Sequence, residues 1–375
     1  MQEVEPRAGG GAKSRKAGSG AKCRDAGGRA RKNRKNRSKA EPKGAEPQSK
    51  ATDAELREKQ NVSNRTQVAV FVLSGLTDDD KLKTVLFILF VFIYLVTIFS
   101  NLALVAIFYN ASNLQNPMYY FLSYLSLVDI FYSSTITPKM LSDLISLKKT
   151  ISFEGCALQF FFLAGLATIE AFLLSTLSYD RYVAICHPLH YVSIMTRMKC
   201  LCLVLLSISF GFLQSCIQTS CVFSLQFYGS YQIDHFYCDA PLILRLSYSE
   251  TSTCDIVTFI IVSALGMGIL MTIFLSYYLV IRSILRIPSA EGKKKAFSTC
   301  SSHLICVVMY FGTIFFTYLH SPSSVLSIQD KVASIFYTAV IPMLNPFIYS
   351  LRNQDVKRTI ISSVQKLLAK CIKCS

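Results

Sequence analysis

The sequence contains few histidines, and none of them belongs to a recognisable catalytic pattern. There are five, at positions 187, 190, 235, 303 and 320. None occurs in an HExxH pattern, and the chain has no GxSxG serine motif. The stretches between its apolar segments are also too short to hold a catalytic domain. We therefore expect no enzyme, no catalytic residue and no metal site.

Charge is missing from long parts of the chain. Residues 84–109 contain no charged residue in 26 positions. About 20 apolar residues span a bilayer as a helix, so this run predicts a transmembrane segment. Six more apolar segments follow, near 117–145, 156–186, 200–224, 255–286, 296–319 and 331–351. The expected fold is all-α, a seven-transmembrane helix bundle over residues 84–351, in which Pro138, Pro342 and Pro346 kink helices without ending them.

Residues 1–60 lack aromatic residues and any apolar periodicity. They hold 17 Lys/Arg and 8 Asp/Glu, a net charge of +9 out of +16 for the chain. Such a segment buries too little apolar surface to fold, so we predict a disordered basic extension. Residues 29–39 also fit a nuclear-localisation or polyanion-binding patch. A solvated tail explains them more simply, and we expect no nucleic-acid partner. No cleavable signal peptide is predicted.

The basic residues that flank the seven segments predict an orientation. Thirteen Lys and Arg residues lie on one side and seven on the other, and the richer side faces the cytoplasm. The N-terminus is then extracellular and the C-terminus cytoplasmic, in a multi-pass plasma-membrane protein. The extracellular segment 61–83 contains glycosylation sequons at Asn61 and Asn64, which are modified only on the lumenal side.

The C-terminal residues 352–375 predict a short amphipathic helix on the cytoplasmic membrane surface. Their apolar residues recur at helical intervals and are separated by Lys and Arg. Cys371 and Cys374 fit palmitoylation sites better than a zinc or redox site, because no partner cysteine pair lies nearby.

Few ionisable residues lie inside the apolar segments, and such residues usually have a function. Asp129 and Glu170 each sit in the middle of a segment, and Asn101 and Asn345 lie at similar depth. Two facing carboxylates bind a cation such as sodium or share a proton. The alternative is that each group is only hydrogen-bonded within the core. No other cofactor is expected.

Asp180 and Arg181 end the third segment. Neighbouring positions on a helix face different directions, so we expect Arg181 to face the bundle while Asp180 and Tyr182 point elsewhere. Polar contacts at such a position suit a conformational switch. Among the thirteen cysteines, Cys156 and Cys238 both lie on the predicted outer side, where a disulfide between them is reasonable. The other cysteines are mostly single and predicted to be small buried residues.

Five stretches, in order, resemble the signatures of rhodopsin-like (class A) G protein-coupled receptors and, within them, of the olfactory receptors. They are LQNPMYYFLSYLSLVD, SYDRYVAICHPLHY, SY at Ser276 and Tyr277, KAFSTCSSHL and PMLNPFIYSLRNQDVK. The resemblance covers roughly residues 64–358. It implies a receptor for small volatile odorants that activates a stimulatory (olfactory-type) G protein and raises cyclic AMP.

The resemblance also implies residue roles. The G-protein switch would comprise Asp180, Arg181, Tyr182, Tyr277 and Tyr349. The ion site would comprise Asp129, Glu170 and Asn345. The odorant would contact Leu163, Ala164, Ala167, Thr168, Ile261, Leu265, Phe311, Ile314, Tyr318 and Thr338. This ligand set is apolar apart from three hydroxyls, and Leu163 stands where amine receptors have an aspartate, so a charged amine is a poor ligand.

Three features depart from the family pattern. Ser100 stands where the family has glycine, residues 1–60 are extra, and Tyr228 and Tyr248 replace two cysteines of the outer loop. The last change predicts the loss of a second disulfide and a looser loop. The sequence leaves two alternatives. One is a receptor of this family working outside the olfactory epithelium. The other, a secondary transporter, is disfavoured because the two halves show no repeat.

Overall fold

The computed structural model describes residues 70–111, 114–227, 231–320, 328–352, 356–362 and 365. The basic extension, both sequons, Tyr228, Cys371 and Cys374 lie outside these residues, as does the side chain of Tyr318.

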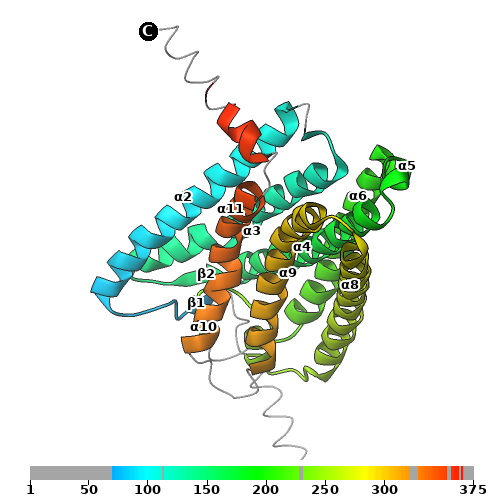
Figure 1. Ribbon diagram of the computed structural model, residues 1–375. Coiled ribbons are helices and arrows are strands. Elements are labelled where there is room, and N and C mark those ends of the chain that lie inside the picture. The colour runs from blue at the N-terminus through cyan, green and yellow to red at the C-terminus, as the bar shows by residue number, and fades with distance from the viewer. Residues whose placement is uncertain are drawn as a thin grey trace, which may run out of the picture. The chain divides into compact units, whose positions relative to one another are not determined.

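Seven long helical segments make up the fold (Figure 1). Six of them are unbroken: α2 (Asp80–Asn110), α3 (Pro117–Ile145), α4 (Phe153–Cys186), α6 (Arg197–Phe223), α8 (Ser252–Arg286) and α9 (Ala290–His320). The seventh consists of α10 (Ile328–Ile335), the π-helical turn η3 (Phe336–Val340) and α11 (Ile341–Arg352). The connections contain η2 (Pro188–His190), α5 (Tyr191–Ile194) and α7 (Ala240–Arg245).

Side-chain caps explain why several helices begin before the apolar runs do. Asp79 accepts hydrogen bonds from the amides of Lys81 and Leu82, so α2 starts at Asp80 and not near residue 84. Ser152 and Thr196 cap α4 and α6 in the same way. Each cap satisfies a backbone donor that has no partner in the first turn.

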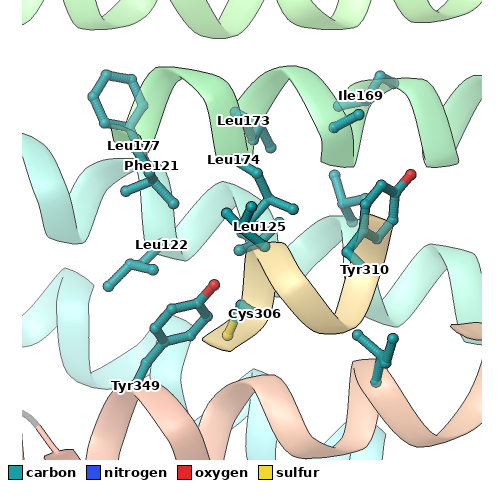
Figure 2. Close-up of a cluster of buried hydrophobic side chains, with 14 of the residues drawn as sticks. Phe121, Leu122, Leu125, Ile169, Leu173, Leu174, Leu177, Cys306, Tyr310 and Tyr349 are labelled. Carbon is teal, nitrogen blue, oxygen red and sulfur yellow. The ribbon is translucent and has the colours of Figure 1, made fainter. Parts of the chain in front are cut away.

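Six of the described segments are long and apolar enough to cross a membrane. The remaining segment, α3, carries Asp129, Lys139 and Asp143, which makes it less apolar. It nevertheless packs between α2 and α4 as part of the same bundle. Helix α4 contacts α3, α6, α8 and α9, and it is the most buried of the six candidate spans. Leucines of α4 pack against α3, α9 and α11 in the core shown in Figure 2.

A three-stranded sheet covers one end of the bundle, and the sequence did not predict it. Strand β1 (Val70–Leu73) pairs antiparallel with β2 (Thr150–Ser152) and parallel with β3 (Gln232–Ile233). We call this the disulfide end, because Cys156 and Cys238 also lie there, and the opposite end the Arg181 end. The sheet joins the segment before α2 to the connections α3–α4 and α6–α8.

The seventh segment continues as a helix through Pro342 and Pro346, so these prolines do not end it. Pro346 has no amide hydrogen, so the carbonyl of Pro342, one turn earlier, loses its helical partner. The Nδ2 group of Asn101 on α2 donates to that carbonyl at 3.0 Å. A neighbouring helix thus replaces the missing bond, as a kinked transmembrane helix requires.

Candidate functional site

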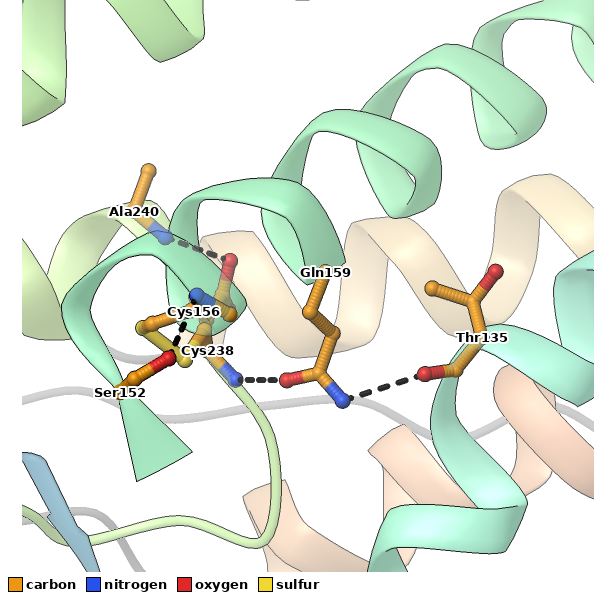
Figure 3. The surroundings of a disulfide bond; sticks show 8 residues. Thr135, Ser152, Cys156, Gln159, Cys238 and Ala240 are labelled. Carbon is orange, nitrogen blue, oxygen red and sulfur yellow. Dashed lines mark hydrogen bonds between the residues drawn. A yellow bond between two sulfur atoms is a disulfide. The ribbon is translucent and has the colours of Figure 1, made fainter. Parts of the chain in front are cut away.

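The Cys156–Cys238 disulfide fixes the loop between α6 and α8 to the start of α4. Next to it, Gln159 uses both ends of its amide (Figure 3). Its Oε1 accepts from the amide of Cys238 at 3.0 Å, and its Nε2 donates to the carbonyl of Thr135 at 3.1 Å. Thr135 lies in the turn of α3 before Pro138, where helical bonding is perturbed. One side chain therefore holds the loop, α4 and α3 together.

A second disulfide, Cys221–Cys254, corrects the expectation that the outer loop has lost one. It joins the last turn of α6 to the first turn of α8. The family cysteines missing at positions 228 and 248 are thus replaced by a pair placed elsewhere. Cys221 lies near the end of one predicted apolar segment and Cys254 directly before another, so neither was predicted to form a disulfide.

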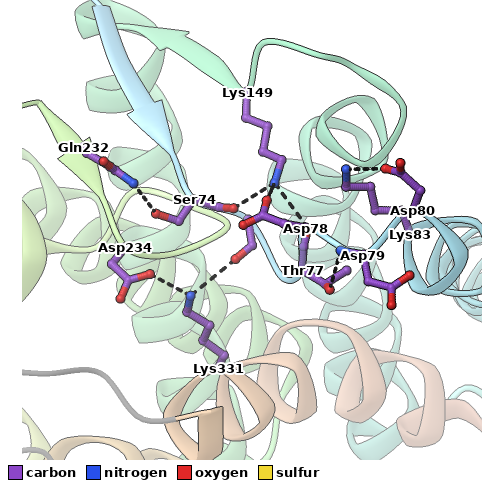
Figure 4. Close-up of polar contacts among 11 residues, drawn as sticks. Ser74, Thr77, Asp78, Asp79, Asp80, Lys83, Lys149, Gln232, Asp234 and Lys331 are labelled. Atoms are coloured by element: carbon purple, nitrogen blue, oxygen red, sulfur yellow. Dashed lines mark hydrogen bonds and ion pairs between the residues drawn. The ribbon is translucent and has the colours of Figure 1, made fainter.

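Ion pairs tie the segment before α2 to its neighbours at the disulfide end (Figure 4). The Lys149 ammonium contacts Asp78 at 2.8 Å and the carbonyl of Ser74 at 3.0 Å. This hydrogen-bonded cation lowers the pKa of the Asp78 carboxyl below its ordinary value. Lys331 on α10 contacts Asp234 at 2.7 Å. The seventh segment is therefore linked to the α6–α8 loop.

The same loop places aromatic side chains over the bundle. Phe236 and Tyr237 are buried, and the Tyr237 hydroxyl bonds to the hydroxyl of Tyr337 in η3. His235 stacks against Phe236, and its Nδ1 is buried with no hydrogen-bond partner among the described residues. Burial lowers the pKa of His235 to about 3, so this imidazole is neutral at physiological pH.

The structure brings the predicted ion-site residues together in the middle of the bundle. Asn345 on α11 donates to both carboxylate oxygens of Asp129 on α3, at 3.1 and 3.2 Å. Glu170 on α4 is fully buried nearby and interacts electrostatically with Asp129. Three helices thus direct oxygen-rich side chains to one buried place, a donor set that suits a hard cation or a shared proton.

The predicted ligand-binding residues do not all share one place. Leu163 is buried in the main core, and Ala167, Phe311 and Ile314 pack against it. Ala164 instead packs on the separate cluster around the disulfide. On α8, Ile261 and Leu265 are half-buried and belong to neither cluster.

Two predicted ligand hydroxyls are already bonded within the protein. Thr168 donates to Oε1 of Gln214 on α6 at 2.8 Å. Thr338 donates to the carbonyl of Ser334 in its own helical segment at 2.6 Å. A third hydroxyl, that of Tyr310 on α9, donates to the carbonyl of Ala167 on α4 at 2.6 Å. Sequence reasoning missed Tyr310 because a tyrosine in an apolar run is typical of ordinary packing.

At the Arg181 end, the expectation that Asp180 and Arg181 point apart is wrong. The guanidinium folds back along α4, and both its Nε and a terminal nitrogen bond to one oxygen of Asp180. The Tyr191 hydroxyl donates to the other oxygen at 2.7 Å. Asp180 has 0% exposure, and an unpaired buried carboxylate is costly, which explains why it gathers these donors. Tyr191, in the connection that follows α4, was missed by the sequence analysis.

The remaining predicted switch residues are distributed around this cluster. The Tyr277 hydroxyl on α8 bonds to Nδ1 of His303 on α9, and both side chains are buried. Tyr349 on α11 is buried beside Cys306 (Figure 2). Tyr182 points away, toward His187, at 3.1 Å. Helices α4, α8, α9 and α11 therefore each contribute a buried polar side chain toward this end.

Known proteins resemble this chain over most of its length. The family described as "Olfactory receptor" matches residues 90–368. Olfactory receptor 5B21 of Mus musculus is 47% identical over 300 residues, 80% of this chain and 94% of that protein. Olfactory receptor 5AP2 of Mus musculus is 48% identical over 297 residues, 79% of this chain and 94% of that protein.

The fold also matches a solved structure. Squid rhodopsin aligns with a TM-score of 0.61 at 16% identity, covering 78% of this chain and 83% of that one. This similarity supports a rhodopsin-like seven-helix fold, and the family match extends across the same bundle. The chain belongs to the olfactory receptor family of rhodopsin-like (class A) G protein-coupled receptors, which are membrane signalling receptors and not enzymes.

Proposed function

We propose that this receptor binds small, mostly apolar volatile molecules within the helix bundle and activates a stimulatory (olfactory-type) G protein, raising cyclic AMP. The observation that carries the proposal is the continuity of α4. Its half toward the disulfide end supplies Leu163 and Ala167, and its last turns hold the Asp180–Arg181 pair. A ligand that shifts α4 against α9 acts on both ends of one helix.

The chemistry of the proposed ligand follows from the side chains around it. Apolar surface comes from four of the predicted ligand contacts, Leu163, Ala167, Phe311 and Ile314. The hydroxyls of Thr168 and Thr338 already donate hydrogen bonds within the protein. A charged ligand would lose its hydration without gaining a partner. An apolar molecule with at most one hydrogen-bonding group is favoured.

In the proposed switch, Arg181 is released from Asp180 when the receptor activates. The pair is closed here, with Tyr191 as a third partner, and this arrangement fits an inactive state. Release would free the guanidinium to contact the G protein, while Tyr277 and Tyr349 rearrange beside it. The ligand needs only a modest difference in affinity between the two states to shift their populations.

We also propose that Asp129, Glu170 and Asn345 hold a sodium ion or share a proton in the inactive state. The convergence of two buried carboxyl groups and an amide supports this. No charged Lys or Arg neighbour is bonded to either carboxylate among the described residues. A bound cation would satisfy them, and movement of α11 would disrupt its coordination.

The proposed orientation places the disulfide end outside the cell and the Arg181 end in the cytoplasm. Two disulfides at one end support it, because they form in an oxidising compartment. The excess of Lys and Arg in the connections at the other end agrees.

A cyclic-AMP assay in cells tests the function. Wild-type receptor should respond to members of a panel of volatile alcohols, aldehydes and esters. The Arg181→Ala variant should reach the surface but lose the response, because the switch cation is gone. Arg282→Ala is the matched control, since Arg282 is an exposed arginine at the same end of the bundle. A full response from Arg181→Ala at equal surface expression would overturn the switch assignment.

A further inference from the structure

A crevice of about 400 Å³ lies between α9 and the first turns of the seventh segment. Gly312, Thr313 and Phe316 form one wall, and Gln329, Val332, Ala333 and Phe336 form the other. None of these seven is a predicted ligand contact. The crevice lies on the side of the α9–α10 contact away from Phe311 and Ile314, which pack on the main core.

The crevice is open toward the surroundings of the bundle. The side chains of Phe316, Val332 and Phe336 at its rim are 45–47% exposed, whereas Ala333 is only 8% exposed. Space remains because two residues are small. A Cβ added at Gly312 would meet nothing within 4 Å. Since α9 and the seventh segment are candidate membrane spans, these exposed apolar side chains would face hydrocarbon.

Gln329 lines the exposed side of the crevice, and two other polar side chains near it are bonded elsewhere. The Thr313 hydroxyl donates to the carbonyls of Met309 and Tyr310 in its own helix. Lys331 turns toward Asp234 and the carbonyl of Gly75 at the disulfide end. These contacts place the crevice next to that end of the membrane. A bound molecule would therefore meet almost only carbon atoms.

We propose that this crevice is a second binding site, open to the bilayer, for a small apolar molecule with an alkyl chain. The inference rests on the proposed function, since it takes the same class of volatile as occupant. Its volume falls within the range of small-molecule sites. Volatile apolar molecules concentrate in hydrocarbon, so they reach the crevice without passing the loop that buries Phe236 and Tyr237.

Occupancy of the crevice bears on the predicted ligand site through shared helices. Gly312 directly follows Phe311, and Phe336 precedes the buried pair Tyr337 and Thr338. A molecule wedged between α9 and α10 fixes the spacing of the two elements that carry those residues. It would therefore tune the response to a ligand inside the bundle.

Photolabelling tests the site without any need for signalling. Purified full-length receptor in phosphatidylcholine nanodiscs is labelled with a diazirine analogue of 1-octanol, with and without excess 1-octanol, and the labelled peptides are mapped. We expect competed labelling on residues 312–316 or 332–336 and uncompeted labelling on the lipid-facing residues Phe259 and Met267 of α8. Labelling of the crevice that 1-octanol does not reduce would mean ordinary lipid contact and would overturn the proposal.

A variant whose side chain fills the crevice can be compared with a variant that adds the same side chain elsewhere. Gly312→Phe should abolish the competed labelling, whereas Gly268→Phe, also at a glycine with nothing within 4 Å of a Cβ, should leave it intact. If Gly312→Phe does not fold, Val332→Phe fills the same space from the exposed side of the other wall. Competed labelling that survives both fillings would overturn the proposal.

The signalling assay separates this inference from the proposed function. If the wild type responds to 1-octanol or another volatile, Gly312→Phe should shift its half-maximal concentration by about tenfold, and Gly268→Phe should not. An unchanged concentration would remove the tuning role. A wild type that responds to no volatile contradicts the proposed function, while the labelling result still decides the site.

Discussion

Asp180 and Arg181 bond to each other although neighbouring positions on a helix face different directions. The long side chain of Arg181 can fold back to reach its neighbour. Leaving the buried Asp180 carboxylate without hydrogen-bond donors would cost more free energy than bending this side chain. The adjacent carboxylate and burial also raise the pKa of Tyr191, so its hydroxyl stays protonated as a donor. The sequence identifies the charged pair but not its third partner, because Pro188 and a short helical turn separate Tyr191 from α4.

Because His235 is buried, we predict that the stability of the folded receptor falls at acidic pH. The pKa of His235 is about 3 in the folded protein, below the ordinary value of 6.5, because burial disfavours the charged imidazole. The unfolded chain therefore binds a proton first as the pH falls below the ordinary value, and the folded state loses stability. Between about pH 7.5 and pH 5 the loss should be about 2 kcal/mol.

Thermal inactivation of the solubilised receptor, followed at both pH values, measures this loss. His235→Phe should be less acid-sensitive, because it keeps an aromatic ring against Phe236 and removes the titrating group. His190→Gln, which changes an exposed histidine at the opposite end, should keep the wild-type acid sensitivity. An equal acid sensitivity of His235→Phe and wild type would contradict the assignment.

At the scale of the elements, close contact between α4 and α6 depends on Gly211. A Cβ at this position would lie 2.5 Å from Cγ1 of Ile169 and 2.8 Å from the carbonyl oxygen of Gly165. The backbone oxygen cannot move away without shifting α4, so Gly211→Ala should destabilise the receptor by about 1–3 kcal/mol. Heating followed by size-exclusion chromatography measures the effect. Gly268→Ala adds the same methyl group in open space and should be neutral.

The Cys221–Cys254 bond anchors an otherwise weakly packed helix. Between Cys254 and Ile269, α8 has no buried residue. Removing both cysteines as serines should cost about 2–4 kcal/mol of stability and lower surface expression. Cys216→Ser, at an exposed free cysteine of α6, is the control. Peptide mapping under non-reducing conditions should find residues 221 and 254 cross-linked, and finding both as free thiols would contradict the structure.

The sequence predicted the helices better than their connections. Seven apolar segments define the spans because bilayer thickness fixes their length. Strands of four, three and two residues carry too little pattern to be recognised, and they pair only after the helices bring them together. The second disulfide was missed for the same reason. Cys221 and Cys254 are 33 positions apart, and only the packing of α6 against α8 makes them neighbours.

At the scale of the whole molecule, motif order predicted the fold and the family, whereas the ligand site depends on side-chain direction. Thr168 illustrates the difference. It lies on α4 five residues after Leu163, and its hydroxyl turns to Gln214 on α6. Ile261 and Leu265 lie on a helix half that packs little. Helical spacing predicts which residues share a face, but neighbouring helices decide what that face contacts.

The proposed orientation makes a prediction for the chain before the bundle. Strand β1 pairs with β2 and β3 at the disulfide end, so residue 70 lies at that end. Asn61 and Asn64 precede it by nine and six residues, fewer than the roughly 20 that span a bilayer, so we expect both sequons on the same side of the membrane. If this side is lumenal during synthesis, both sequons are accessible to glycosylation.

Treatment with peptide N-glycosidase should therefore lower the apparent mass of the wild-type receptor, and the double variant Asn61→Gln, Asn64→Gln should show no shift. Deletion of residues 2–60 removes the basic extension but keeps both sequons, so it should show the same shift as the wild type. That result would mean that the flanks of the helices set the orientation and the +9 extension does not. An unglycosylated wild type whose N-terminal epitope is stained only after permeabilisation would reverse the proposed orientation.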